Sequence, residues 1–105
     1  MILIESKWVC RLLKIRGITL YPFIIVNDVN NSILLNHEAI HIAQQKELYV
    51  FRFYYIYIKE YLTNLKIYKN HWLAYFNIRF EKEAFANERN FIYLKTRKKK
   101  SYLNY

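Results

Sequence analysis

The most constraining feature of this chain is the stretch from Ile33 to Asn64, which contains neither glycine nor proline. The whole sequence has one glycine and one proline, the residues that most often interrupt helices and form turns. Apolar residues lie almost all round the middle of this stretch, as in a helix that runs through a core. We therefore predict one long helix over 33–64, capped by Asn31 or Ser32, in a mainly α (α+β) fold.

Two shorter elements are expected before this helix. Ser6–Arg16 places apolar residues along one stripe and is followed by Gly17, a typical helix stop, which indicates a short helix. Ile18–Val26 is β-branched and aromatic and is expected to form a strand. Pro22 lies in its middle and cannot donate to a ladder, so the strand is expected at a sheet edge. Its free side would then be open to an extended substrate.

The C-terminal part is expected to hold a connector over residues 65–79 and a last helix from about Phe80 to Leu94. The formal net charge is +9, but five of the seventeen basic residues lie within 95–105. Without that segment, twelve basic and eight acidic residues leave +4. We expect residues 1–97 to form a single domain, since the chain is too short for two cores. Residues 98–105 are expected to be a basic tail that frays from the last helix.

The composition narrows the class of protein further. Hydrophobic residues make up 54% of the chain and aromatic residues 19%, which argues against disorder. The single cysteine, Cys10, excludes an intramolecular disulfide and fits a reducing, cytoplasmic compartment. The opening "MILIESKWVC" lacks the order of a secretory signal. The longest apolar stretch, Leu48–Ile58, is shorter than the roughly 18–20 residues of a spanning helix. Its tyrosines and flanking cations suit a membrane surface, so peripheral membrane contact stays open.

The predicted long helix carries the motif "HEAIH" at residues 37–41. His37 and His41 are four residues apart, so their imidazoles lie on one helical face and can point at one ion. Neutral imidazole suits Zn²⁺, and Glu38 emerges close enough to take a proton from a water on that ion. The alternative is a pair of surface histidines on a polar helix face.

A catalytic zinc site needs a third protein ligand and one open position. The segment "FEKEAFANERN" offers four residues on one helical face, namely Glu81, Ala84, Phe85 and Glu88. Glu81 is the candidate ligand, with Glu83 on a different face as the alternative, and Ala84 is small enough to let two helices pack closely. The alternative is that Glu81 and Glu83 are solvated carboxylates that pair with Lys82 or Arg79.

These motifs resemble a known class of zinc peptidases. "HEAIH" followed by "EKEA" is similar to the gluzincin arrangement, with the Glu-x-x-Ala spacing of the CAAX prenyl endopeptidase and heat-shock membrane peptidase families. More closely, "YPFIIV", "NHEAIHIAQQKEL" and "FEKEAFANE" together resemble small, uncharacterised bacterial zincin-like proteins over most of residues 17–97. The resemblance implies a minimal zincin-like domain with a Zn²⁺ cofactor. His37, His41 and Glu81 would be the ligands and Glu38 the general base.

One position departs from the peptidase pattern, which often continues Glu-x-x-Ala-Asp with the Asp orienting a ligand histidine. Phe85 occupies that slot here. Support for the ligands must then come from Glu88, Gln44 or Asn87. A solvated glutamine is the other reading of Gln44. In related peptidases a His or Tyr stabilises the oxyanion, and the candidates here are His71 and Tyr75. A partly exposed structural role is the alternative for His71.

The predicted function is therefore a zinc-dependent, metallopeptidase-like hydrolase of peptide bonds, with a peptide or protein as its substrate. The first alternative is a zincin-like module that binds metal without turnover. The second is a basic, aromatic membrane-surface binding protein in which the histidine pair is incidental. The Lys98–Lys100 cluster has no accompanying base-reading motif, so no specific nucleic-acid partner is expected.

Overall fold

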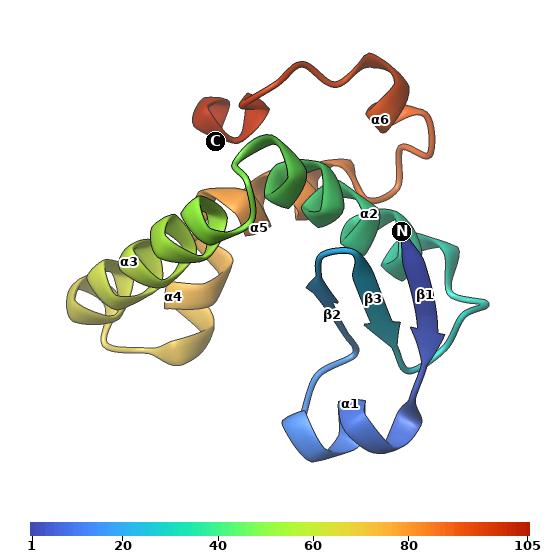
Figure 1. Cartoon of the computed structure of the whole chain (residues 1–105). Coiled ribbons are helices and arrows are strands. Elements are labelled where there is room, and N and C mark those ends of the chain that lie inside the picture. Colours follow the sequence, from blue (N-terminus) through green and yellow to red (C-terminus); the bar gives the residue numbers. More distant parts are fainter.

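The computed structural model describes all residues, 1–105, and contains a three-stranded sheet and six α-helices (Figure 1). The strands are β1 (Ile2–Glu5), β2 (Gly17–Leu20) and β3 (Phe23–Val26). The helices are α1 (Lys7–Leu13), α2 (Ser32–Glu47), α3 (Phe51–Tyr68), α4 (His71–Phe76), α5 (Arg79–Asn87) and α6 (Tyr93–Thr96), followed by a 3₁₀ turn, η1 (Ser101–Asn104). The predicted mainly helical α+β fold is confirmed.

The predicted single strand over 18–26 is wrong, because Tyr21-Pro22 forms a turn with a cis peptide bond and divides it into β2 and β3. The order in the sheet is β1-β3-β2, with β1 parallel and β2 antiparallel to β3. Pro22 therefore lies outside the ladder, so its missing N–H costs the sheet no hydrogen bond. β3 is the central strand and β2 is an edge strand. The first strand, β1, was not predicted.

The helix α1 begins where the sequence suggests and ends earlier. The Ser6 hydroxyl accepts a hydrogen bond from the Val9 backbone N–H, a typical N-terminal cap. The helix ends at Lys14, which has a left-handed conformation with φ of 56°. Gly17, expected to stop this helix, instead opens β2.

The predicted continuous helix over 33–64 is also wrong, because the chain breaks between α2 and α3. Tyr49 and Val50 have φ of 57° and 63°, conformations that non-glycine residues rarely adopt. After the break α3 turns away from α2 (Figure 1). Leu48 and Phe53, on either side of the break, are both buried in one core cluster. Apolar packing thus fixes a break that no glycine or proline marks.

Of the two predicted caps, Asn31 and Ser32, the first is confirmed: the Asn31 side chain accepts a hydrogen bond from the Leu34 N–H at the start of α2. The last predicted helix, 80–94, is in fact two, because α5 ends at Asn87. The side-chain amide of Asn36 donates to the carbonyls of Asn87, Glu88 and Asn90. It thereby satisfies carbonyl groups that a helix end leaves without partners.

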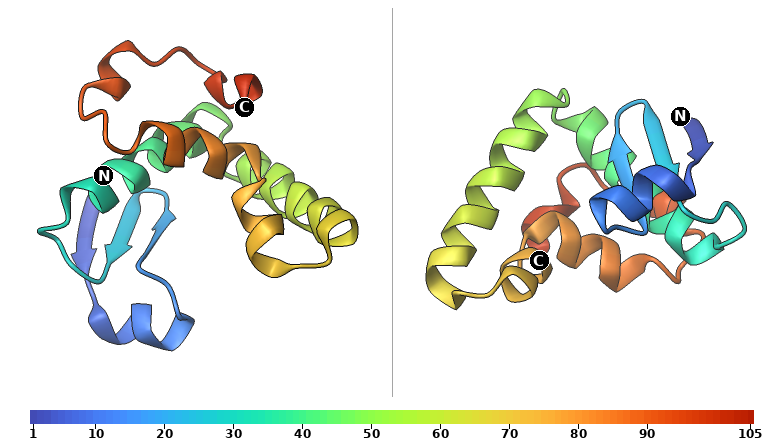
Figure 2. Two further views of the ribbon diagram at one scale, coloured as in Figure 1. Left: turned by 180° about the vertical axis from the view of Figure 1, so that it is seen from behind. Right: turned by 90° about the horizontal axis from the view of Figure 1, so that it is seen from below.

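The main core cluster contains Leu48, Phe53, Ile78, Phe80 and Tyr102, and a smaller one under the sheet contains Ile24, Val26 and Leu34. Tyr102 belongs to the segment that was expected to fray, and that expectation is wrong. Its ring centroid lies 4.5 Å from that of Phe80. Figure 2 shows the C-terminal segment looping back over the helices to reach α5.

None of the helices combines the length and the apolar character that crossing a membrane requires.

Candidate metal centre

Two helices that lie side by side carry the candidate ligands (Figures 1 and 2). His37 and His41 are one turn apart on α2, and Glu81 lies in the first turn of α5. Ala84, one turn beyond Glu81, is fully buried. A small residue there allows the close helix packing that the sequence predicted.

The three candidate ligand atoms form a nearly equilateral triangle. The Nε2 atoms of His37 and His41 are 3.2 Å apart, and each lies 3.1 Å from Oε1 of Glu81. A tetrahedral zinc ion with bonds of about 2.0–2.1 Å separates its ligands by about 3.3 Å. The triangle therefore has the dimensions of three corners of such a tetrahedron. Two imidazoles and one carboxylate are also a donor set that Zn²⁺ prefers.

The hydrogen bonds of the other ring nitrogens decide which atoms face the triangle. Nδ1 of His37 lies 2.9 Å from a carboxylate oxygen of Glu88, so Nδ1 carries the proton. Nδ1 of His41 lies 2.7 Å from Oε1 of Gln44. Gln44 must accept there, because its amide nitrogen donates to Phe80 O and to Glu83. In the neutral rings both Nε2 atoms then present lone pairs to each other and to Glu81. Either a metal ion or a proton on one of the Nε2 atoms relieves this arrangement, and the same atoms are therefore candidate metal ligands.

Two tyrosines hold the third candidate ligand. The Tyr57 hydroxyl donates to Oε2 of Glu81 at 2.7 Å, and the Tyr75 hydroxyl lies 3.3 Å from Oε1. Burial, followed by the charge of Glu81, raises the pKa of both tyrosines well above the ordinary value. Both phenols therefore stay protonated and act as hydrogen-bond donors.

The centre strongly favours positive charge. Burial by itself lowers the pKa of His41, but the charge and hydrogen bond of Glu81, with smaller contributions from Glu38 and Gln44, raise that pKa to about 9. Burial raises the pKa of Glu81, but the two histidines outweigh it and bring that pKa below its ordinary value. His37, Glu38, His41 and Glu81 are only 4–5% exposed. A carboxylate kept ionised in so buried a place fits a cation site.

The Glu38 carboxylate lies between α2 and β2. The Thr19 hydroxyl donates to its Oε2 at 2.7 Å. On the other side, a Cβ atom added to Gly17 would lie 3.2 Å from Oε1 of Glu38. The only glycine in the chain is thus placed where the backbone of β2 closely approaches this carboxylate. The two contacts hold Glu38 in one orientation.

A buried guanidinium ties the two ligand helices together. Arg97 donates to Glu47 on α2, at 2.9 and 3.1 Å, and to both carboxylate oxygens of Glu83 on α5. The side chain of Arg97 is 5% exposed and that of Glu83 is fully buried. Hydrogen bonds from Arg97 and Gln44 lower the pKa of Glu83 in spite of its burial. Because Gln44 bonds both Glu83 and His41, the Arg97 cluster and the histidine pair form one connected network.

Other predicted residues make no hydrogen bond to the candidate ligands. His71 is exposed, its Nδ1 lies 2.8 Å from the Tyr61 hydroxyl, and it makes no hydrogen bond to a candidate ligand. Asn87 bonds the Glu83 carbonyl and the Tyr105 hydroxyl rather than a candidate ligand. Phe85 packs its ring 4.5 Å from that of His37. Of the predicted supporting residues, Gln44, Glu88 and Tyr75 contact the three candidate ligands.

The solvated alternative for the acidic pair is wrong, since Glu81 and Glu83 are both buried and neither pairs with Lys82 or Arg79.

Sequence reasoning missed three contributors to the site: Thr19, Tyr57 and Arg97. Tyr57 sits within the apolar stretch Leu48–Ile58, for which the sequence predicts a helix through a core or contact with a membrane surface. Arg97 was grouped with the basic segment 95–105. No spacing rule links any of the three to the HEAIH motif.

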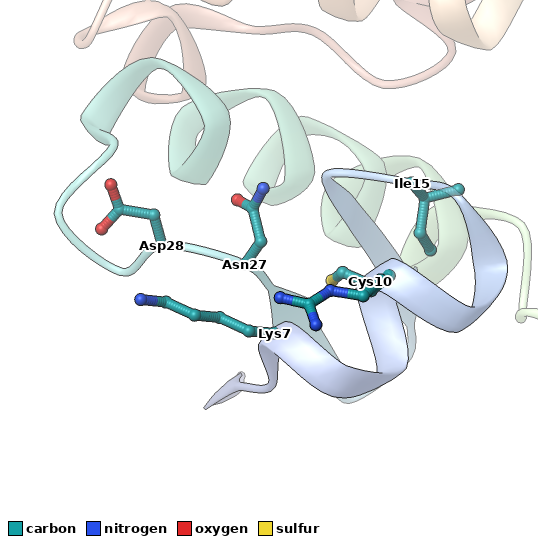
Figure 3. Close-up of a pocket in the computed structure, with 6 residues that line it drawn as sticks. Lys7, Cys10, Ile15, Asn27 and Asp28 are labelled. Carbon is teal, nitrogen blue, oxygen red and sulfur yellow. The ribbon is translucent and has the colours of Figure 1, made fainter.

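The predicted free edge for a substrate strand is partly occupied. The side-chain amide of Gln45 donates to the Thr19 carbonyl at 2.9 Å and accepts from the Tyr21 N–H at 2.8 Å. Figure 3 shows a hollow elsewhere, beside α1, which is lined by residues such as Lys7, Cys10 and Asp28 and by none of the candidate ligands.

Comparisons with protein-family models, curated proteins and solved structures find no match for this chain. Its function must therefore be inferred from the geometry of the candidate metal centre.

Proposed function

We propose that this chain is a zinc-dependent hydrolase that acts on peptide bonds. The supporting observation is the triangle of three lone-pair donors from His37, His41 and Glu81, each with its own hydrogen-bond partner behind it. Three protein ligands leave one position of a tetrahedral ion open, as in catalytic rather than structural zinc sites. A glutamate directly follows the first histidine, where a general base is needed.

Zinc held by these residues would polarise a substrate carbonyl and lower the pKa of a water toward about 7. Glu38 has the task of taking a proton from the attacking water and passing it to the leaving amine. The Thr19 hydroxyl and the close backbone of Gly17 keep its carboxylate in one orientation. Tyr75 remains protonated beside the centre and is the proposed donor to the developing oxyanion.

The test compares the zinc-loaded wild type with Glu38→Gln on a library of quenched fluorescent peptides. The wild type is expected to cleave, and Glu38→Gln to lose about 10²–10⁴-fold in rate, the usual contribution of a general base. Both should bind one zinc per chain. Glu60→Gln makes the same change at a distant ion pair with Arg79 and serves as the matched control. Full activity of Glu38→Gln would contradict the proposal.

A second candidate function is a zinc-binding module without turnover. The observation in its favour is the low exposure of all four central residues, since substrate must reach the open position. This function predicts one tightly bound zinc, a higher unfolding temperature with zinc, and no cleavage of any library peptide by the wild type. The same library experiment therefore separates the two functions.

A further inference from the structure

One face of the sheet packs on α2 at the central strand, and the opposite face is apolar throughout. Ile24 and Val26 point toward α2 and are buried in the smaller core cluster. The strand registers place six other side chains together on the opposite face: Ile2, Ile4, Ile18, Leu20, Phe23 and Ile25. All six are apolar, and Ile2, Ile4, Leu20 and Phe23 are 39–49% exposed. We call these six residues the uncovered sheet face. A sheet face that stays in water is normally polar, so an apolar one indicates that something covers it.

A basic, amphipathic helix lies beyond the end of this sheet (Figure 1). Trp8 and Leu12 are one turn apart on α1 and are 71% and 63% exposed. Four exposed cations accompany them in the same segment: Lys7, Arg11, Lys14 and Arg16. The only acidic residue in residues 1–26 is Glu5, and its carboxylate accepts from the Val29 N–H. Asp28 lines the same hollow as Lys7 and Arg11 but forms no ion pair with them, so the segment combines apolar surface with an excess of positive charge.

The charge balance indicates what covers this surface. Of the seventeen Lys and Arg residues, only Arg79 and Arg97 form ion pairs with carboxylates. Most of the acidic residues, in turn, are engaged inside the molecule by His37, Thr19, Arg79 or Arg97. A second copy of the chain would bring the same excess of positive charge to the interface. The partner must therefore supply both apolar surface and negative charge.

We propose that the uncovered sheet face and α1 dock together on the surface of a bilayer that contains anionic lipids. Trp8, Leu12 and the strand side chains enter the boundary between headgroups and acyl chains, and the four cations lie among the lipid phosphates. Since α2 packs on the opposite face of the sheet, docking leaves the candidate metal centre facing away from the lipid. This proposal is independent of the proposed hydrolase activity.

The test is flotation of the full chain with vesicles of phosphatidylcholine alone and with 30% phosphatidylglycerol. We expect binding to the anionic vesicles that decreases as salt is raised. Lys7→Gln combined with Arg11→Gln should weaken binding roughly 25-fold, at about fivefold per cation near an anionic surface. The matched control combines Lys98→Gln with Lys99→Gln, which removes the same charge elsewhere and should change binding much less.

The apolar contribution is tested by Ile2→Asp, with Leu62→Asp as its control. The two residues are 49% and 52% exposed, but Leu62 lies on α3. Ile2→Asp is expected to lower binding at least tenfold, and Leu62→Asp to leave it nearly unchanged. Zinc binding and thermal unfolding of each variant verify the fold. Three results would overturn the proposal: equal loss in both variants, no binding to anionic vesicles, or a concentration-dependent dimer that Ile2→Asp abolishes.

Discussion

The α2–α5 interface buries charged and polar side chains, whereas the N-terminal segment, residues 1–26, exposes apolar ones. At the interface, five ionisable side chains are withdrawn from water: His37, His41, Glu81, Glu83 and Arg97. No buried side-chain nitrogen or oxygen in the molecule lacks a hydrogen-bond partner. In the N-terminal segment, by contrast, the uncovered sheet face and α1 leave large apolar side chains in water.

The two kinds of surface need different packing partners. Buried polar groups are tolerated only when their partners stand at hydrogen-bond distance, so they fix α2 against α5 within a fraction of an ångström. An apolar face requires only that water be removed, and any apolar surface can do this. We therefore infer that the first region is built for a small, well-positioned ion and the second for an extended surface.

The largest expected effect comes from removing the guanidinium that joins the two ligand helices. Arg97→Met leaves the buried carboxylates of Glu83 and Glu47 unpaired and should lower the free energy of unfolding by about 3–5 kcal/mol. The control is Arg79→Met, whose side chain is 38% exposed in its pair with Glu60, and it should lose about 0–1 kcal/mol. Urea unfolding measures both. Equal losses of free energy in the two variants would mean that the buried Arg97 ion pairs stabilise the protein no more than an exposed pair does.

The next effect concerns the third candidate ligand. Glu81→Gln keeps the shape of the side chain but removes its charge, and should weaken zinc binding at least about 100-fold. Removing a residue that only hydrogen-bonds a ligand typically weakens metal binding about 10–100-fold. Competition with a chromophoric chelator measures the affinity. Glu60→Gln is again the control. Unchanged affinity would show that α5 takes no part in metal binding.

Residues behind the histidines should have intermediate effects. Gln44→Leu and Glu88→Ala each remove the acceptor of one Nδ1–H group and are expected to weaken zinc binding about 10–100-fold. Chelator competition is again the measurement, with Asn87→Ala on the same helix turn as the control. If Asn87→Ala has an equal effect, the loss comes from general packing and not from histidine orientation.

A smaller effect is expected where β2 approaches Glu38. In Gly17→Ala the new methyl group would lie 3.2–3.3 Å from Glu38, Val26 and Leu34, so these neighbours must shift. Slight overpacking of this kind should lower the free energy of unfolding by about 1 kcal/mol. Any peptide hydrolysis should fall much more than zinc affinity, because Glu38 moves while the ligands stay. If zinc affinity falls and hydrolysis does not, the assignment of Glu38 as a general base outside the ligand set is contradicted.

The smallest effect should come from the uncovered sheet face. Ile2→Thr keeps a β-branched side chain at an exposed position and should change the free energy of unfolding by no more than about 0.5 kcal/mol. Ile24→Thr, on the covered face and 1% exposed, should lose at least about 2 kcal/mol. Thermal or urea unfolding of both variants makes the comparison. A large loss at Ile2 would mean that the chain covers this face itself.

The central residues of the candidate site could be found from sequence because they share helical faces. The spacing of His37 and His41, and the later face that carries Glu81 and Glu88, follow from 3.6 residues per turn and need no tertiary information. Gln44 was found for the same reason, since it lies one turn beyond His41. Thr19, Tyr57 and Arg97 could not be found, because each reaches the centre from an element whose position depends on packing.

The sequence alone determined which residue types repeat along a helix, and hence the helical class, a cap at Asn31 or Ser32 and the set of candidate ligands. Local periodicity carries this information, because it depends only on the geometry of one element. Only the tertiary structure decided the break at Tyr49 and Val50, the division of the expected strand at Pro22 and the return of Tyr102 to the core. The break and the return of Tyr102 depend on burying apolar side chains from distant segments together. That gain in free energy overrides local backbone preference and is invisible to any pattern within a single element.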